Sequence, residues 1–295
     1  MRNFLKIKHL LQYRIVKLLY GFFKIFPIGT ASSIGGFIGR NLGKLLKVNR
    51  VARRNIKNAF PDFTDEQVED TVLKMWDNLG RVAGEFPHMT AFKGDDFAKI
   101  VEVEGAEYIK QAGESGKTAI FFSGHFANWE IVPKTIFEKG CPSVNLVYRK
   151  SNNPYLDKLI LDVRSNYQQG CMPKGTKGAR MIIKAIKESK HIGMLVDQKQ
   201  NDGIPVPFFG RDAMTAPAIA SLALKYDCQL IPVQVRRVGG AKFKVKVYEP
   251  FKFDHTGNEH KDIRLAMIRI NSIFEGWIKQ EPSQWFWVHN RWPKE

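Results

Sequence analysis

Between residues 100 and 280, short apolar runs alternate with longer stretches in which apolar residues recur every three or four positions. The short runs predict strands at about 118–123, 144–149, 191–197, 228–236 and 242–249. The longer stretches predict helices at about 128–139, 154–168, 178–189, 216–226 and 259–280. Strands that alternate with helices favour parallel pairing. The pattern therefore predicts an α/β fold with a mixed, partly parallel sheet flanked by helices.

The start of the chain shows a different pattern, FLKIKHLLQYRIVKLLYGFFKIF over residues 4–26. On a helical wheel of about 100° per residue, four of its basic residues fall within roughly 80° of one another: Lys6, Arg14, Lys17 and Lys24. Bulky apolar side chains occupy the opposite arc: Leu11, Ile15, Leu18, Leu19, Phe22, Phe23 and Phe26. Lys8 and Leu10 break the pattern. Such a helix is typical of the headgroup region of an anionic membrane. A helix docked on the protein's own core is the alternative, and the recurring charges disfavour a transmembrane span.

Two further helices are expected between this segment and residue 100. Pro27 ends the first helix, and Gly35, Gly39 and Gly43 then recur every four residues, a spacing that lets helices approach closely. Farther along, Thr64 and Gln67 form a capping box ahead of an apolar stripe of helical period. We expect residues 1–47 to form a helical, membrane-associated extension, and residues 48–295 to form the main domain.

Charge adds a constraint on partners. The 295 residues include 46 Lys and Arg against 29 Asp and Glu, which gives a formal net charge of +17. This surplus points to an anionic partner: a nucleic acid, a phospholipid surface or an acidic protein. The aromatic residues lie in apolar runs and no recognisable nucleic-acid motif is present, so we expect no nucleic-acid partner. Three widely separated cysteines indicate reduced thiols, and the seven histidines show no metal-ligand spacing.

Two short motifs suggest chemistry that their context does not support. GESGKT at 113–118 resembles a phosphate-binding loop, but Gln111 stands where the first glycine is required, and the motif precedes a strand. Ser123 lacks the G-x-S-x-G elbow of serine hydrolases. We therefore expect a turn at the first site and no serine hydrolase at the second.

FFSGHFANWE, residues 121–130, has a more informative context. Ser123 and Gly124 end an apolar strand, so His125 is expected at the carboxyl end of that strand, where active sites of open α/β sheets lie. Glu130 is expected about one turn into the next helix, within reach of the imidazole. A carboxylate on one ring nitrogen would leave the other free to take a proton from a hydroxyl. A capping histidine and a helix-start glutamate would have the same spacing.

An ordered set of segments resembles the lysophospholipid-acyltransferase superfamily, which is marked by His, four residues, then Asp or Glu. Within it, the chain resembles the late lauroyl or myristoyl acyltransferases of lipid A biosynthesis. The segments are RRNIKNAFPD (53–62), MWDNLGRVAGEF (75–86), GHFANWE (124–130), VYRKSNNP (147–154), LVDQK (195–199), VPFFGRDAMTAPAIASLALKYDCQLIPV (206–233) and QWFWVHNRW (284–292).

This resemblance implies that residues 48–295 transfer an acyl chain from an acyl-carrier protein to a hydroxyl of a lipid A precursor. His125 would be the general base and Glu130 its orienting partner. Substrate contacts are implied for Arg149, as an anion or oxyanion contact, and for Asp197 and Arg211, while Asn128 would shape the turn beside the substrate. The thioester is already activated, so no cofactor or metal is expected. The implied location is the cytoplasmic face of a bacterial inner membrane, against anionic lipids.

Two other functions remain open at this stage. The first is acylation of a lysophospholipid or of a glycosylated phosphoinositide, because no single residue identifies the acceptor. The second is a non-catalytic basic module that binds membranes, for which His125 and Glu130 would be dispensable. Transfer assays that offer both kinds of acceptor, with His125 intact or replaced, separate these functions.

Overall fold

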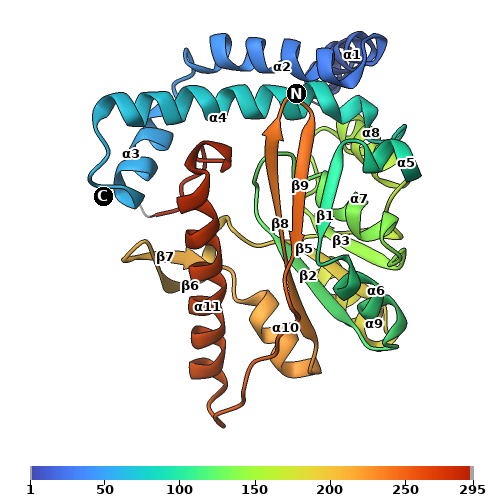
Figure 1. Ribbon diagram of the computed structural model, residues 1–295, viewed down its shortest axis with the longest axis vertical. Helices are drawn as coiled ribbons and strands as arrows, with labels where there is room; N and C mark the ends of the chain where they lie inside the picture. Colours follow the sequence, from blue (N-terminus) through green and yellow to red (C-terminus); the bar gives the residue numbers. More distant parts are fainter. Residues whose placement is uncertain (1, 293–295) are drawn as a thin grey trace.

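The computed structural model describes residues 2–292, which form a seven-stranded sheet with helices on both faces (Figure 1). The strand order is β1 (Val101–Glu104), β9 (Lys242–Val247), β8 (Gln229–Gly239), β2 (Ala119–Ser123), β5 (His191–Leu195), β3 (Val144–Tyr148) and β4 (Gly170–Pro173). All neighbouring strands are parallel except β8 and β9. This arrangement confirms the predicted mixed, partly parallel sheet.

Five helices follow the predicted pattern closely: α7 (Ile131–Glu138), α8 (Pro154–Arg164), α9 (Thr176–Lys187), α10 (Ala218–Tyr226) and α11 (Glu259–Gln280). Helix α6 (Ala106–Glu114), between β1 and β2, was not predicted. Helices α7 and α8 lie on one face of the sheet, and α11 lies on the opposite face. Several boundaries differ from the prediction by two to four residues, and one of them bears on the site. Helix α7 begins at Ile131, three residues later than expected, and this delay decides where Glu130 points.

Side chains of the central strand β2 alternate between the two faces of the sheet. Phe122 is buried on the α11 side, where its ring lies 6.0 Å from that of Phe274 between centroids. Phe121 and Ser123 point to the opposite face, toward α7 and α8. The same strand therefore supplies the core on one side and the wall of a pocket on the other.

The N-terminal region contains α1 (Arg2–Ile25), α2 (Ile28–Gly43), α3 (Asn49–Ala59), α4 (Asp65–Glu85), the short 3₁₀ helix η1 (Phe86–His88) and α5 (Gly94–Ala98). The predicted capping box is confirmed, because the Thr64 side chain accepts a hydrogen bond from the Gln67 backbone N–H, and the Gln67 side chain accepts one from the Thr64 N–H. The turn predicted for GESGKT is also present, between α6 and β2.

The glycine ladder of α2 lies against α4. A Cβ atom on Gly35 would lie 2.3 Å from the carbonyl oxygen of Gly80, and one on Gly39 would lie 2.3 Å from that of Trp76. Neither contact leaves room for a side chain, so glycine is required for the two helix backbones to approach this closely. The sequence predicted such an approach, and the structure identifies α4 as the partner.

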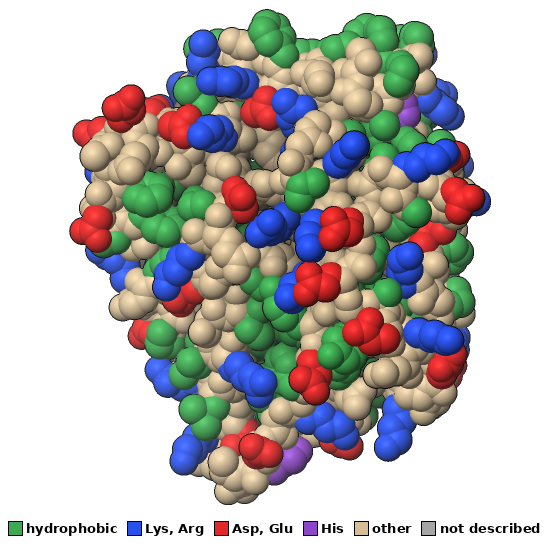
Figure 2. Space-filling model, in the orientation of Figure 1, with side chains coloured by type: hydrophobic (Ala, Val, Ile, Leu, Met, Phe, Trp, Pro, Cys, Tyr) green, Lys and Arg blue, Asp and Glu red, His purple; other side chains and the backbone are tan. Residues whose placement is uncertain are grey.

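The outer sides of α1 and α2 present apolar side chains to the surface. Leu11, Ile15, Leu18, Leu19 and Phe22 are all exposed, and only Phe23 of the predicted apolar face is buried. Figure 2 shows hydrophobic side chains along the edge formed by these helices. The apolar face is therefore not docked on the protein's own core. Within residues 2–292, no helix is long and apolar enough to span a bilayer.

A second, two-stranded sheet is formed by the residues between β5 and α10 in the sequence. Its antiparallel strands are β6 (Lys199–Phe208) and β7 (Arg211–Thr215), and β6 packs against α11. The chain ends with the 3₁₀ helix η2 (Pro282–Gln284) and a segment that returns to the turn after β2. This return brings the C-terminal aromatic residues beside His125.

Candidate active site

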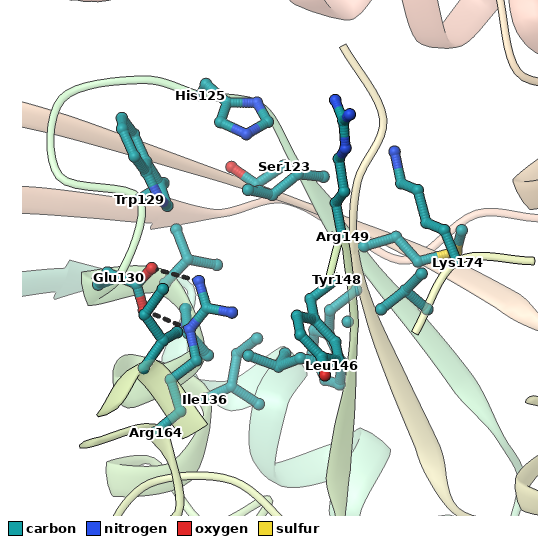
Figure 3. Close-up of a pocket in the computed structure, with 18 of the residues that line it drawn as sticks. Ser123, His125, Trp129, Glu130, Ile136, Leu146, Tyr148, Arg149, Arg164 and Lys174 are labelled. Carbon is teal, nitrogen blue, oxygen red and sulfur yellow. Dashed lines mark hydrogen bonds and ion pairs between the residues drawn. The ribbon is translucent and has the colours of Figure 1, made fainter. Parts of the chain in front are cut away.

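A pocket of about 230 Å³ opens at the carboxyl edge of the sheet, between β2, β5 and β3 on one side and α7 and α8 on the other (Figure 3). Polar residues line its mouth: Ser123, His125, Arg149, Lys174 and Gln198. Apolar side chains line much of the chamber below: Phe121, Val132, Ile136, Leu146, Ile160 and Met194. The polar residues Glu130, Tyr148, Asp157 and Arg164 line the rest. The pocket thus combines a cationic mouth with a largely apolar interior.

The turn that holds His125 is shaped by steric and hydrogen-bond constraints. A Cβ on Gly124 would lie 3.0 Å from the carboxylate of Asp197, so only glycine allows that carboxylate to come so close. Ala127 adopts a positive φ of 44°, which is unfavourable for a residue with a side chain. Its N–H donates to the Gln284 carbonyl at 2.8 Å, and the Phe286 N–H donates to the His125 carbonyl at 3.1 Å. The C-terminal segment therefore fixes the turn.

The hydrogen-bonding partner of the His125 ring is Asp197. The distance from His125 Nδ1 to Asp197 Oδ1 is 2.7 Å, and the backbone N–H of His125 donates to Oδ2, also at 2.7 Å. Trp285 Nε1 donates to the same Oδ2 at 2.8 Å. A carboxylate only accepts, so Nδ1 carries the ring proton and Nε2 can accept at the pocket mouth, where the Gln198 side-chain nitrogen lies 3.4 Å away.

Asp197 is ionised although its side chain is buried. Burial alone would raise the pKa of this carboxyl, but the neighbouring His125 ring and the hydrogen bonds from His125 hold the pKa well below its usual range. Asp197 is therefore an anion throughout the physiological pH range. It was expected as a substrate contact, whereas it lies beneath His125 and does not line the pocket.

The expected contact between Glu130 and the imidazole is not formed. Glu130 instead pairs with Arg164 of α8, with Oε1 2.5 Å from Nη2 and Oε2 3.0 Å from Nε, and it accepts a hydrogen bond from Tyr167 at 2.9 Å. The reason is local, because the positive φ at Ala127 delays the helix. Glu130 is then the residue before α7 rather than a residue of its first turn, and its side chain points along the pocket wall toward α8.

The Glu130–Arg164 pair is buried, and the pKa values of its members reflect this. Burial would raise the pKa of Glu130, but the charge and hydrogen bonds of Arg164 lower it overall. The pKa of Tyr167 is raised well above its usual value, first by burial and then by the neighbouring Glu130 charge. Neither Arg164 nor Tyr167 was identified from the sequence. Arg164 and Tyr167 are three residues apart near the end of a predicted helix. This spacing places both side chains on one helix face and could have indicated that they act together.

Two cations stand at the mouth of the pocket. Arg149 follows β3 and Lys174 follows β4, and Figure 3 shows both side chains extending upward beside His125. Neither side chain forms a hydrogen bond or ion pair with another residue in the described part of the chain. The pKa of Lys174 is lowered by partial desolvation, and the nearby Arg149 charge acts in the same direction. The placement of Arg149 near His125 agrees with the sequence expectation.

Asn128 and Arg211 do not line this pocket. Asn128 is buried, accepts a hydrogen bond from the Glu130 N–H at 3.1 Å, and donates to Glu85 Oε2 at 2.8 Å. Arg211 is exposed at the start of β7, in the two-stranded sheet. Asn128 thus shapes the turn, as the sequence suggested, but from inside the protein.

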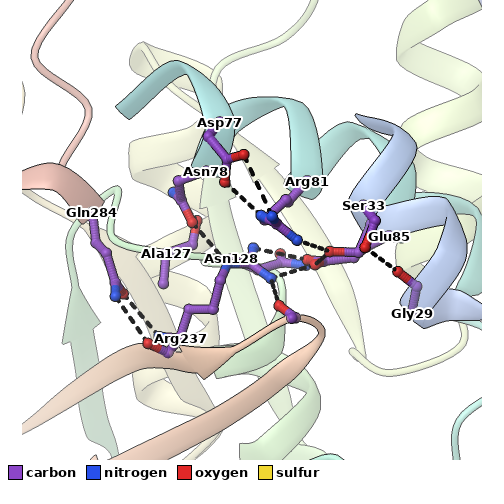
Figure 4. Close-up of polar contacts among 12 residues, drawn as sticks. Gly29, Ser33, Asp77, Asn78, Arg81, Glu85, Ala127, Asn128, Arg237 and Gln284 are labelled. Atoms are coloured by element: carbon purple, nitrogen blue, oxygen red, sulfur yellow. Dashed lines mark hydrogen bonds and ion pairs between the residues drawn. The ribbon is translucent and has the colours of Figure 1, made fainter. Parts of the chain in front are cut away.

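Glu85 connects Asn128 to two other parts of the fold, α2 and β8 (Figure 4). It is completely buried at the end of α4, where it also accepts a hydrogen bond from Ser32 of α2 at 2.7 Å and pairs with Arg237 of β8. The Arg237 Nε donates to Asn78 at 3.0 Å, and Asn78 donates to the Ala127 carbonyl at 3.0 Å. The turn after β2 is therefore held by polar contacts from α4 and β8.

No group of three or more His, Cys, Asp or Glu side chains suited to a metal ion occurs within residues 2–292. The chemistry that the mouth can perform with its own side chains is proton transfer by His125, assisted by Asp197, next to two cations.

Replacing Glu130 by Gln should destabilise the fold by roughly 3–5 kcal/mol at pH 7, because Arg164 would lose its buried counter-charge. The folded-state pKa of Glu130 is depressed, so the contribution of its charge is present above the unfolded pKa and is lost as pH falls through the folded one. The difference in the free energy of unfolding between wild type and variant should therefore become smaller below about pH 4.5. Urea unfolding at several pH values measures this difference.

Glu69→Gln is the matched control, because Glu69 also binds an arginine, Arg53, but at the exposed surface. Its effect on stability should be small. An equal loss of stability in the two variants, or a gap for Glu130→Gln that does not change with pH, would contradict the role assigned to the buried pair.

Comparison with known proteins agrees with the resemblance seen in the sequence. The model of the bacterial lipid A biosynthesis acyltransferase family matches residues 2–294. A lipid A biosynthesis acyltransferase of Haemophilus influenzae is 23% identical over 268 residues, covering 89% of this chain and 81% of that protein. The lipid A biosynthesis lauroyltransferase of Escherichia coli is 23% identical over 263 residues, covering 86% and 83%.

Among solved structures, the 1-acyl-sn-glycerophosphate acyltransferase of Thermotoga maritima aligns with 95% of this chain and 99% of its own, at 16% identity and a TM-score of 0.40. That likeness is too distant to bear on the site. The family match, which spans nearly the whole chain, is sufficient: this protein belongs to the bacterial lipid A biosynthesis acyltransferases.

Proposed function

We propose that the protein transfers a fatty acyl chain from acyl-carrier protein to a hydroxyl of a lipid A precursor, at the cytoplasmic face of a bacterial inner membrane. The observation that carries this proposal is the hydrogen bond between His125 and Asp197 at the mouth of an apolar chamber. The family membership supports acyl transfer in lipid A biosynthesis, and the geometry supplies a mechanism.

In this mechanism, Nε2 of His125 takes the proton of the acceptor hydroxyl as its oxygen attacks the thioester carbonyl. The C–O bond forms, the C–S bond breaks, and the proton passes from His125 to the departing sulfur. Asp197 holds the imidazole in the required tautomer and stabilises the imidazolium. A base positioned in this way contributes about 10²–10⁴-fold to the rate. Glu130 acts indirectly, because its pair with Arg164 builds the wall beside the base.

The chamber suits the hydrocarbon part of an acyl donor. Its walls are mostly apolar side chains of the sheet on one side and of α7 and α8 on the other, with the charged Asp157 and Arg164 of α8 among them. Each methylene group that leaves water for such a site contributes about 0.8 kcal/mol to binding. A chain bound there has its thioester end at His125, so the position of the base and the apolarity of the chamber support the same substrate.

Arg149 and Lys174 fit an acceptor or donor that carries phosphate. Two cations next to each other repel, and an anion between them removes this repulsion. Arginine also presents a planar pair of donors that suits a phosphate group or a developing oxyanion. A phosphorylated glycolipid and the phosphopantetheine arm of the carrier both have such groups.

The exposed apolar sides of α1 and α2 support attachment to the membrane that contains the acceptor. Basic residues accompany them, and each contributes about 1 kcal/mol near an anionic bilayer. The surface also adjoins the pocket mouth, because Asn153, four residues after Arg149, donates a hydrogen bond to the His9 carbonyl of α1 at 2.8 Å. Helices that lie in the interface would thus bring the mouth to the lipid.

Replacing His125 by Ala should reduce transfer from acylated carrier protein to purified lipid A precursor by at least about 10²–10⁴-fold, because the proton acceptor is lost. Mass spectrometry of the lipid product measures the transfer, with a lysophospholipid offered as a second acceptor. His255→Ala, at an exposed loop histidine, is the matched control. Near-normal transfer by folded His125→Ala would refute the mechanism, and transfer to the lysophospholipid alone would replace the proposed acceptor.

Replacing Leu18 and Ile25 together by Ser should make membrane binding sensitive to salt. Both side chains are more than 70% exposed, so the fold should not change. Wild type should stay on anionic vesicles at high salt, whereas the variant, which has lost part of its apolar contact, should be released to a greater extent. Vesicle sedimentation at low and high salt checks this. Release of the wild type by salt alone would exclude apolar attachment.

A further inference from the structure

We propose that the hydroxyl of Ser123 donates a hydrogen bond to the carbonyl oxygen of the acyl thioester and stabilises the oxyanion that forms there during transfer. This inference rests on the proposed acyl transfer and adds a second catalytic residue to it. It is carried by an unpaired buried hydroxyl and by its place in the pocket.

The Ser123 side chain lacks a hydrogen-bond partner although it is only 1% exposed. Several buried side-chain polar atoms in the described part of the chain share this property, but only Ser123 belongs to a residue that lines the pocket. A buried hydroxyl without a partner is costly, and buried polar groups are normally paired. A partner that arrives with the substrate explains why a serine stands at this position.

The position of Ser123 matches that of a carbonyl group in a bound acyl chain. Phe121 and Ser123 lie on the same face of β2, with Phe121 in the apolar chamber, and His125 follows at the mouth. Figure 3 shows Ser123 directly beneath His125. A chain with its tail beside Phe121 and its reacting carbon within reach of a hydroxyl activated by His125 must place its carbonyl next to Ser123.

The chemistry of transfer requires a donor at this point. When the acceptor oxygen adds to the thioester carbon, the π electrons move onto the carbonyl oxygen, and a hydrogen bond to that oxygen stabilises the new charge. Ser123 keeps its proton throughout, since the proton that moves travels from the acceptor hydroxyl to His125 and on to the sulfur. The donor therefore needs no base of its own.

Ser123 is not arranged as a nucleophile. Its oxygen makes no hydrogen bond to His125 or to any other described residue, so no described side chain draws off its proton. A purely structural role is equally unsupported, because the hydroxyl contributes no bond to the fold. Alanine would fill the same space without leaving a polar atom unpaired.

Steady-state kinetics of Ser123→Ala test the proposal. We expect kcat with acylated carrier protein to fall by about 10–10³-fold, with KM nearly unchanged. The melting temperature should be unchanged or raised, because the variant no longer buries an unpaired hydroxyl. Ser123→Cys, whose thiol is a weak donor of similar shape, should fall between wild type and Ser123→Ala. Ser221→Ala, on α10 and outside the pocket, is the control. An unchanged kcat in folded Ser123→Ala would overturn the proposal.

A second measurement reads the hydrogen bond without turnover. In a His125→Ala background, a bound acyl-pantetheine thioester labelled with ¹³C at its carbonyl should show an infrared stretch at lower frequency when Ser123 is present than in the Ser123→Ala double variant. Equal frequencies would overturn the proposal. So would an acyl adduct on wild-type protein, formed without acceptor and absent from Ser123→Ala, because that result makes Ser123 a nucleophile.

These two readouts separate the inference from the proposed function. If wild type transfers no acyl chain to a lipid A precursor, the proposed function fails. The infrared shift needs only donor binding, so it would still show whether Ser123 holds the carbonyl.

Discussion

The buried carboxylate of Asp197 is the point on which the site depends. It accepts hydrogen bonds from the backbone and ring of His125 and from the indole of Trp285, and so joins the ends of two neighbouring strands to the C-terminal segment. Burying a charge is costly unless it is paired and hydrogen-bonded, and three short hydrogen bonds offset that cost here. In return the imidazole has one orientation, with Nε2 toward the pocket.

Two further buried carboxylates act in the same manner at other points of the turn. Glu130 meets Arg164 from α8, and Glu85 meets Arg237 from β8 together with Ser32 and Asn128. In each case a buried carboxylate on one element forms an ion pair with an arginine on another. Because an unpaired buried charge is costly, these pairs favour one relative position of the two elements. The turn between β2 and α7 is therefore fixed from both sides, and the helices with the exposed apolar surface are tied to it through Ser32.

The main strands and helices could be predicted because their apolar periodicity reflects burial, and the site could be placed because His125 follows a buried strand. The short edge strands β1 and β4 were not predicted, since four residues are too few to show a period. The hairpin of β6 and β7 was not predicted either. The partner of Glu130 was wrongly predicted because sequence spacing assumed that the helix begins near residue 128. A positive φ at Ala127 delays it, and no pattern in the sequence signals that φ. Asp197 was named, but its role required knowing that β5 pairs with β2.

The central claim is that Asp197, and not Glu130, orients the base. The most direct measurement is kcat per folded molecule for Asp197→Asn and for Glu130→Gln, with acylated carrier protein as donor and lipid A precursor as acceptor. Asp197→Asn keeps the shape but removes the charge that holds the imidazole, so its kcat should fall by about 10²–10⁴-fold. Folded Glu130→Gln should retain much more activity. A near-normal kcat for Asp197→Asn alongside a large loss for Glu130→Gln would contradict the account.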